Sequence, residues 1–186
     1  FNMLASCKAE TNTWSPLFFS TDEKHIVTLL ADIILPTTNT PGALDVNVPQ
    51  FIDLMYHDIE TKENQDLFKK GALTFAEKFK SQFNAEIIKG KKEQFENLLA
   101  SYFKISDEAS KTILLEQKLP FENLSVSQTE NYLLYKFLLS VKAYTIFGYF
   151  TSEKVGEEVL NYDPIPGAQI GCLPIKKVPN ERIWAL

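Results

Sequence analysis

Apolar side chains recur along most of this chain at intervals of three and four residues, the spacing that gathers them on one face of an α-helix. The first such segment follows a capping box, Ser20–Glu23, and ends before Pro36. The pattern predicts six further helical segments, near residues 49–59, 63–83, 95–102, 106–114, 127–150 and 152–160. We therefore expect an all-α protein.

The segment 127–150 differs from the others because apolar residues lie on every side of it. It opens with a second capping box, Ser127–Glu130, and only Lys136, Ser140 and Lys142 interrupt its apolar run. A helix that is hydrophobic all round is expected to be buried all round. The sequence therefore predicts a compact bundle of about six to seven helices packed around this central helix.

The helical pattern stops after residue 160. Residues 161–186 contain four prolines, which forbid a regular helix: Pro164, Pro166, Pro174 and Pro179. The same residues are too apolar for a free linker. We interpret 161–186 as an irregular, Pro-rich C-terminal strap that packs on the domain or on a partner, and residues 18–160 as the helical domain.

Residues 1–17 are expected to be the remnant of an export or lipoprotein signal, followed by an extended lead-in. The run Leu4–Cys7 resembles the bacterial lipoprotein processing box, in which small residues precede a cysteine that becomes lipidated. Cys7 is therefore a lipidation candidate, and the end of an ordinary signal segment is the alternative. Because the chain begins with Phe rather than Met, we expect its natural amino terminus to lie upstream. Both interpretations predict a protein of the bacterial periplasm or cell envelope.

Residues 37–47 are rich in Thr, Asn, Pro and Gly and show no periodicity, which predicts a loop between the first two helices. Within it, Thr40–Ala43 predicts a type II turn. Pro41 presets φ at the second position of such a turn, and Gly42 accepts a positive φ at the third. The turn would reverse the chain and could present the loop to a partner.

Composition narrows the classes of protein to which the chain can belong. It has 186 residues and a net charge of −5, from 19 Lys and Arg against 24 Asp and Glu. Such an acidic chain, with scattered basic residues, does not suit nucleic acid, whose phosphates need clustered Lys and Arg. The sequence contains no uncharged run of about 18 apolar residues, so it predicts no membrane-spanning helix. The 14 Phe and 7 Tyr indicate a core filled by large rings.

Residues suited to catalysis or to cofactor binding are few. The glycines are too dispersed for a phosphate loop, and the Cys and His spacings of haem and zinc sites are absent. His25 is expected to be exposed on the first helix. Asp53 and His57 lie four residues apart on one helix face and are expected to form a local pair, with a metal or acid–base role as the alternative. We therefore expect no catalytic, cofactor-binding or metal-binding residue.

Cys172 has no neighbouring base in the sequence, so we expect no catalytic role for it. A free cysteine most often behaves as a small buried hydrophobe. A disulfide to Cys7 is the alternative, and it would exclude lipidation of Cys7.

Two regions of the chain carry a more specific pattern. The first consists of Ala31–Pro36, Thr38–Ala43 and Val48–Asp53. The second consists of Gly148–Ser152, Leu160–Tyr162 and Pro166–Gly167. Together they closely resemble the signature of the gluconate 2-dehydrogenase subunit 3 family. Asn39 departs from the family pattern, which commonly has Asp at this position.

The resemblance implies a non-catalytic small subunit that accompanies a large flavoprotein dehydrogenase of the glucose–methanol–choline type, acting on a sugar or polyol. FAD, and haem c of a cytochrome c subunit, would then belong to the partner chains. The resemblance also implies that a twin-arginine signal on the small subunit exports the folded complex. The irregular segments supply our candidates for the partner contact: Pro41, Gly42, Ala43, Tyr162, Pro166, Gly167 and Trp184.

Two other interpretations stay open at the level of the sequence. The chain could be a free-standing envelope lipoprotein with a binding role. It could also be an enzyme built on Asp53, His57 and other helix carboxylates, in which case both side chains should point into a deep pocket.

Overall fold

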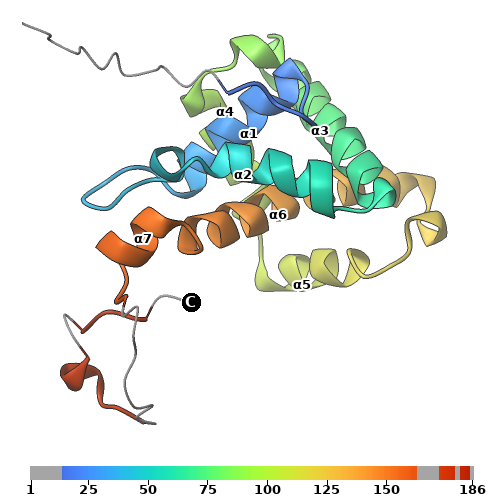
Figure 1. The fold of residues 1–186 in the computed structure, drawn as a ribbon. Helices are drawn as coiled ribbons and strands as arrows, with labels where there is room; N and C mark the ends of the chain where they lie inside the picture. The colour runs from blue at the N-terminus through green and yellow to red at the C-terminus, as the bar shows by residue number, and fades with distance from the viewer. Residues whose placement is uncertain (1–13, 163–171, 179–180, 185–186) are drawn as a thin grey trace, which may run out of the picture.

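The computed structural model describes residues 14–162, 172–178 and 181–184, and within them the protein is an all-α bundle of seven helices (Figure 1). This confirms the predicted fold class. The helices are α1 (Thr21–Ile34), α2 (Val48–Leu54), α3 (Lys62–Phe83), α4 (Lys92–Phe103), α5 (Asp107–Glu116), α6 (Val126–Phe150) and α7 (Glu153–Glu158). Short 3₁₀ turns occupy Leu44–Val46, Ile87–Lys89, Phe121–Asn123 and Ile175–Lys177.

Helix α1 begins at the predicted capping box. The backbone N–H of Ser20 donates to Glu23 Oε2 at 2.7 Å, and the N–H of Glu23 donates to Ser20 Oγ at 3.3 Å. Lys69 of α3 also donates to Glu23 Oε2, at 3.0 Å. The capping residues therefore satisfy backbone groups at the start of α1, and Glu23 also connects the start of α1 to α3.

Helix α2 continues into a π-helical turn, Met55–Ile59. The N–H of Glu60 closes this turn by donating to the carbonyl of Met55, five residues earlier, at 2.9 Å. π-Helical turns are rare and are often found at functional positions. Here the turn sets the side chains of Tyr56 and Glu60 against α6.

Helix α6 is the central element, as predicted, and it packs against α1, α2, α3, α5 and α7. Its start differs from the prediction. Ser125, rather than Ser127, is the N-cap, and its backbone N–H donates to Gln128 Oε1 at 3.1 Å. Two overlapping Ser-x-x-Gln/Glu frames are present, and the Ser125 frame starts the helix two residues earlier than the Ser127 frame would.

The expectation that α6 is buried all round is wrong for its C-terminal half. Residues such as Phe137, Leu138 and Val141 are completely or almost completely buried. Ile146 is 39% exposed and Phe147 is 50% exposed. Helix α2 reaches one edge of this stripe, where the ring of Phe51 lies 5.7 Å from that of Phe147, but it leaves Ile146 and half of Phe147 exposed.

Aromatic rings form the centre of the bundle. The ring of Phe68 on α3 lies 4.9 Å from that of Phe137 on α6, and Phe75 lies 5.8 Å from Phe95 on α4. All four side chains are at most 1% exposed. The abundance of Phe in the sequence therefore reflects a core in which few, large side chains join three helices.

The described part of the tail meets the helical domain at the end of α7. The backbone N–H of Asn161 donates to the carbonyl of Ile183 at 2.8 Å, within a parallel bridge between Asn161 and Trp184. In Figure 1 residues 172–178 lie beyond α7, away from the other helices. Packing of the whole strap on the domain or on a partner remains a prediction.

Candidate functional site

The loop between α1 and α2 is organised by one carboxylate. Asp45 Oδ2 accepts hydrogen bonds from Thr37 Oγ1 at 2.6 Å and from the N–H of Gly42 at 2.7 Å. These two donors, the Thr37 hydroxyl first, hold the pKa of Asp45 below its usual value. The N–H of Ala43 donates to the carbonyl of Leu35 at 2.8 Å, which returns the loop to the end of α1.

The predicted type II turn at Thr40–Ala43 is wrong, because Gly42 does not have a positive φ. A glycine is needed there for space instead. A Cβ on Gly42 would lie 2.4 Å from the backbone nitrogen of Thr37 and 2.7 Å from its Oγ1. The Pro-Gly sequence thus marks a close approach of two backbone segments, and the pattern alone does not distinguish this from a turn.

The predicted partner-contact residues have different environments. Gly42 and Ala43 are buried, and Pro41 is half-buried with its carbonyl accepting from Tyr149 Oη at 2.8 Å. Tyr162 is 58% exposed and Trp184 is 47% exposed. Pro166 and Gly167 lie outside the described residues, as does Cys7. That the seven predicted residues contact a partner remains a prediction.

An apolar groove lies along the exposed stripe of α6, close to the tail. It has a volume of about 380 Å³. We call its apolar lining the apolar end of the molecule: Ala143, Ile146, Phe147, Phe150, Leu160, Ile183 and Trp184. The bond from Tyr149 to Pro41 brings the α1–α2 loop to this same end of α6. In Figure 1 the loop lies above the α6–α7 end and the tail lies below it, so both irregular segments are near this end of α6.

The α6 part of the apolar end was not predicted, because a helix that is apolar on every side is expected to be buried on every face. A signal was nevertheless present. The C-terminal half of α6 carries an additional apolar stripe with i, i+3, i+4, i+7 spacing, formed by Ala143, Ile146, Phe147 and Phe150. The neighbouring helices do not fully bury this additional stripe.

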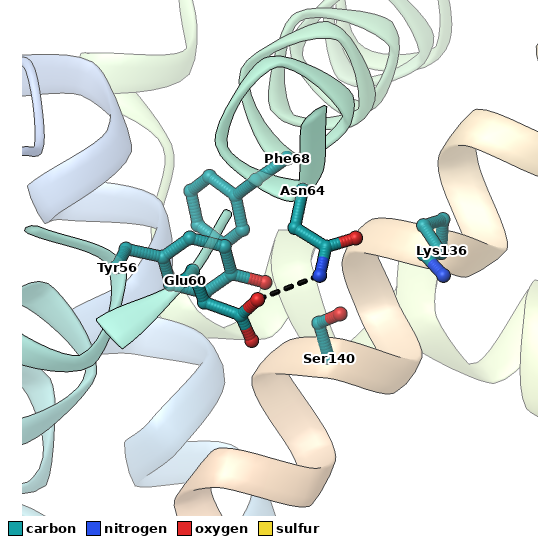
Figure 2. Close-up of a pocket in the computed structure, with 6 residues that line it drawn as sticks. All are labelled: Tyr56, Glu60, Asn64, Phe68, Lys136 and Ser140. Carbon is teal, nitrogen blue, oxygen red and sulfur yellow. Dashed lines mark hydrogen bonds between the residues drawn. The ribbon is translucent and has the colours of Figure 1, made fainter. Parts of the chain in front are cut away.

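A second cavity, polar and smaller, lies where the π-helical turn faces α3 and α6 (Figure 2). Its volume is about 130 Å³, and it is lined by Tyr56, Glu60, Asn64, Phe68, Lys136 and Ser140. Asn64 Nδ2 donates to Glu60 Oε2 at 2.6 Å, and Tyr144 Oη donates to Glu60 Oε1. A polar cavity of this size can hold several ordered waters.

Burial is the main influence on the tyrosines around this cavity. It raises the pKa of Tyr56 to about 12, and the negative charge of Glu60 adds to the rise while Ser140 opposes it. The pKa of Tyr144 is also raised, first by burial and then by its hydrogen bond to Glu60. Both phenols are therefore neutral hydrogen-bond donors at neutral pH.

The sequence singled out Lys136 and Ser140 only as interruptions of an apolar helix. With Tyr144 they recur every four residues along α6 and so share one face. That spacing was the available signal for a polar strip on the central helix. The partners on the π-helical turn were not predictable, because an α-helix was expected there.

Asp53 and His57 do not form the predicted local pair. Asp53 is completely buried, and its carboxylate accepts three backbone N–H groups from Leu17, Phe18 and Phe19. His57 is exposed and pairs with Asp58 at 2.5 Å. Among the described residues, neither Asp53 nor His57 lines the polar cavity, the apolar groove or the other main cavities. The arrangement gives no support to an enzyme built on these two side chains.

Two further sequence expectations about single residues are wrong. His25 is half-buried, with Nε2 at 3.3 Å from the carbonyl oxygen of Gly90 and its ring edge-on to Phe95. Cys172 is exposed rather than buried, with φ of 54°. The disulfide alternative involves Cys7 and lies outside the described residues.

Searches for two other kinds of site gave negative results in the part of the chain that the structure describes. No group of three or more His, Cys, Asp or Glu side chains there is placed to hold a metal ion. None of the helices there combines the length and the apolar character that crossing a membrane requires.

Comparison with known families gives one match. The sequence matches the family described as gluconate 2-dehydrogenase subunit 3 over residues 21–167, a range that runs from the first residue of α1 into the tail. No protein of curated function and no solved structure matches the chain. The matched range includes both regions on which the resemblance in sequence rests.

Proposed function

Because the chain belongs to the gluconate 2-dehydrogenase subunit 3 family, we propose that it is the non-catalytic small subunit of a flavin-dependent sugar or polyol dehydrogenase. In this role it binds the large flavoprotein subunit, stabilises it and assists its export. FAD belongs to the large subunit, and haem c to a cytochrome c subunit where one is present. The family match over residues 21–167 is the observation that carries the proposal.

The surface of the protein is compatible with such a role. The apolar end exposes Phe147, Trp184 and Ile183 beside one another, with 50%, 47% and 63% of each side chain accessible. Aromatic and aliphatic side chains grouped in this way are typical of contact surfaces between proteins. We propose that the apolar end, with the adjacent Pro41 loop, contacts the large subunit.

Export is the part of the proposal that rests on the amino terminus. The resemblance of Leu4–Cys7 to a lipoprotein processing box supports a location in the bacterial periplasm or envelope, with Cys7 as the lipidated residue. A free-standing envelope lipoprotein is the competing function. It differs in one measurable respect, since it would need no dehydrogenase.

The test is to isolate the flavoprotein dehydrogenase that co-purifies with this chain from its natural source, and then to produce that dehydrogenase with and without the chain. We expect the two proteins to co-purify with bound flavin, and we expect the dehydrogenase made alone to be less stable and to stay in the cytoplasm. Dye-linked sugar or polyol oxidation measures the activity. Turnover by the isolated chain would refute the non-catalytic role, and normal export and stability of the dehydrogenase made alone would refute the escort role.

A further inference from the structure

A third cavity, which shares no lining residue with the apolar end, lies between α1, α4, α5 and α6. Its volume is about 470 Å³, within the range of roughly 300–1,000 Å³ typical of small-molecule sites. Leu30 and Leu138, which are 1% and 2% exposed, form its floor. The floor is therefore the surface of the hydrophobic core itself.

The remaining lining is apolar except for two groups. Ile34, Leu99 and Phe103 form the walls, and Lys142 and Ser110 supply a positive charge and a hydroxyl. No Asp or Glu lines the cleft. Its polar groups are thus suited to an anion or another hydrogen-bond acceptor.

Among the described residues, Lys142 has no acidic partner. None of the ion pairs in residues 14–162, 172–178 and 181–184 includes it, and its Nζ lies 5.6 Å from the centroid of the Phe103 ring. Lys142 is exposed, and a charge-assisted hydrogen bond from its ammonium to a carboxylate is stronger than a hydrogen bond between neutral groups.

Helix α5 forms the outer side of this cleft and is joined to α6 near its C-terminal end, where Gln128 donates to Glu116 and Gln117 donates to the carbonyl of Tyr132. It has no buried residue, and it stands apart from the other helices in Figure 1. Ser110 lies on its half-buried face. A ligand can therefore enter between α5 and the bundle without disturbing the core.

From these observations we propose that the cleft binds a medium-chain fatty acid. The alkyl chain lies along Leu30 and Leu138, and the carboxylate accepts hydrogen bonds from Lys142 Nζ and Ser110 Oγ. An uncharged alkyl ligand would leave the ammonium unpaired, and a cationic one would be repelled by it. The proposal does not depend on the dehydrogenase partner.

The test begins with calorimetric titration of the full chain with hexanoate, octanoate and decanoate below their micelle concentrations. Burial of each additional methylene should tighten binding roughly fourfold until the cleft is full. Decanol should bind more weakly than decanoate, and decyltrimethylammonium more weakly still. Equal affinity for the three decyl compounds, or no saturable binding, would overturn the proposal.

Matched lysine variants then locate the carboxylate. Lys142→Gln should weaken decanoate binding roughly tenfold or more and leave decanol binding unchanged. Lys70→Gln is the control, because Lys70 also lies over a phenylalanine ring, 5.2 Å from the centroid of Phe121, but outside the cleft. Equal losses in the two variants would assign the effect to general charge and contradict the proposal.

A third variant tests whether the ligand occupies this cleft at all. Ser110→Phe places a ring at the outer side of the cleft without replacing a core residue, and circular dichroism checks that the fold is kept. Binding of both decanoate and decanol should fall at least tenfold. Unchanged binding by a folded Ser110→Phe protein would place the ligand elsewhere and overturn the proposal.

Discussion

The buried carboxylate of Asp53 holds the segment that leads into α1. Its Oδ1 accepts the N–H groups of Phe18 at 3.0 Å and Phe19 at 2.8 Å, and its Oδ2 accepts that of Leu17 at 2.7 Å. These donors precede α1, whereas Asp53 lies in α2. The carboxylate therefore fixes the segment that carries Phe18 and Phe19 into the core, a structural role rather than a catalytic one.

Replacement of Asp53 by Asn tests this role at the residue scale. The amide keeps one acceptor oxygen and turns an NH₂ group toward backbone N–H donors, so buried donors lose their partners. We expect the free energy of unfolding in urea to fall by about 3 kcal/mol. Asp58→Asn is the control, because Asp58 is exposed, and its effect should stay within about 0.5 kcal/mol. A loss of similar size in both variants would contradict the argument.

Tyr56 gives a prediction for alkaline pH. Its pKa is raised from 10.0 to about 12 by burial in the folded protein. The unfolded chain therefore loses this proton first, and stability declines as the pH rises through the interval from 10 to about 12. When the pH is raised from 8 to 11, the free energy of unfolding should fall in both proteins, and the fall should be about 1.4 kcal/mol smaller for Tyr56→Phe than for the wild-type protein. Urea unfolding at both pH values measures the difference, and Tyr162→Phe, at an exposed position, is the control.

At the scale of elements, the closest packing joins α3 to α6. A Cβ on Gly71 of α3 would lie 2.4 Å from the carbonyl oxygen of Leu133 and 2.6 Å from Cβ of Phe137 on α6. Glycine is unfavourable inside a helix by roughly 1 kcal/mol relative to alanine. Glycine is needed at position 71 despite this cost, because the backbones of α3 and α6 are too close there to leave room for a side chain.

Gly71→Ala should therefore destabilise the protein, although alanine favours the helix. We expect a loss of about 2 kcal/mol, the order typical of overpacking in a close-packed interior. Thermal and urea unfolding measure it. Leu73→Ala, two positions along α3 with a side chain that is 62% exposed, should change stability by less than about 1 kcal/mol. A stabilised Gly71→Ala protein would show that α3 and α6 can separate at this point without loss.

At the scale of the whole molecule, the apolar end lies beyond the part of α6 that α3 covers. Placing a charge there tests the proposed contact with the large subunit. Ile146→Asp should weaken the complex at least about tenfold, since an unpaired carboxylate would be desolvated in the interface. Co-purification and binding titrations measure the loss. Leu115→Asp, at a position on α5 that is 63% exposed, is the control and should bind normally. Equal binding by both variants would exclude the apolar end as the contact.

Local patterns determined much of the fold. The capping box at Ser20 and the periodicity of α3 depend on residues within a few positions of one another, so they were predictable from the sequence. The all-α class and the family followed from similar short-range patterns. The central place of α6 was predictable too, because its apolar content exceeds what one helix face can bury.

Only the tertiary structure decided which polar groups meet and which apolar faces stay exposed. Asp53 finds donors 34 to 36 residues away, and Tyr149 finds the carbonyl of Pro41 across 108 residues. Gly42 is required by the approach of Thr37 rather than by its own φ. Such outcomes depend on how helices pack, because burial and hydrogen bonding are set by neighbours in space, whereas periodicity records only neighbours along the chain.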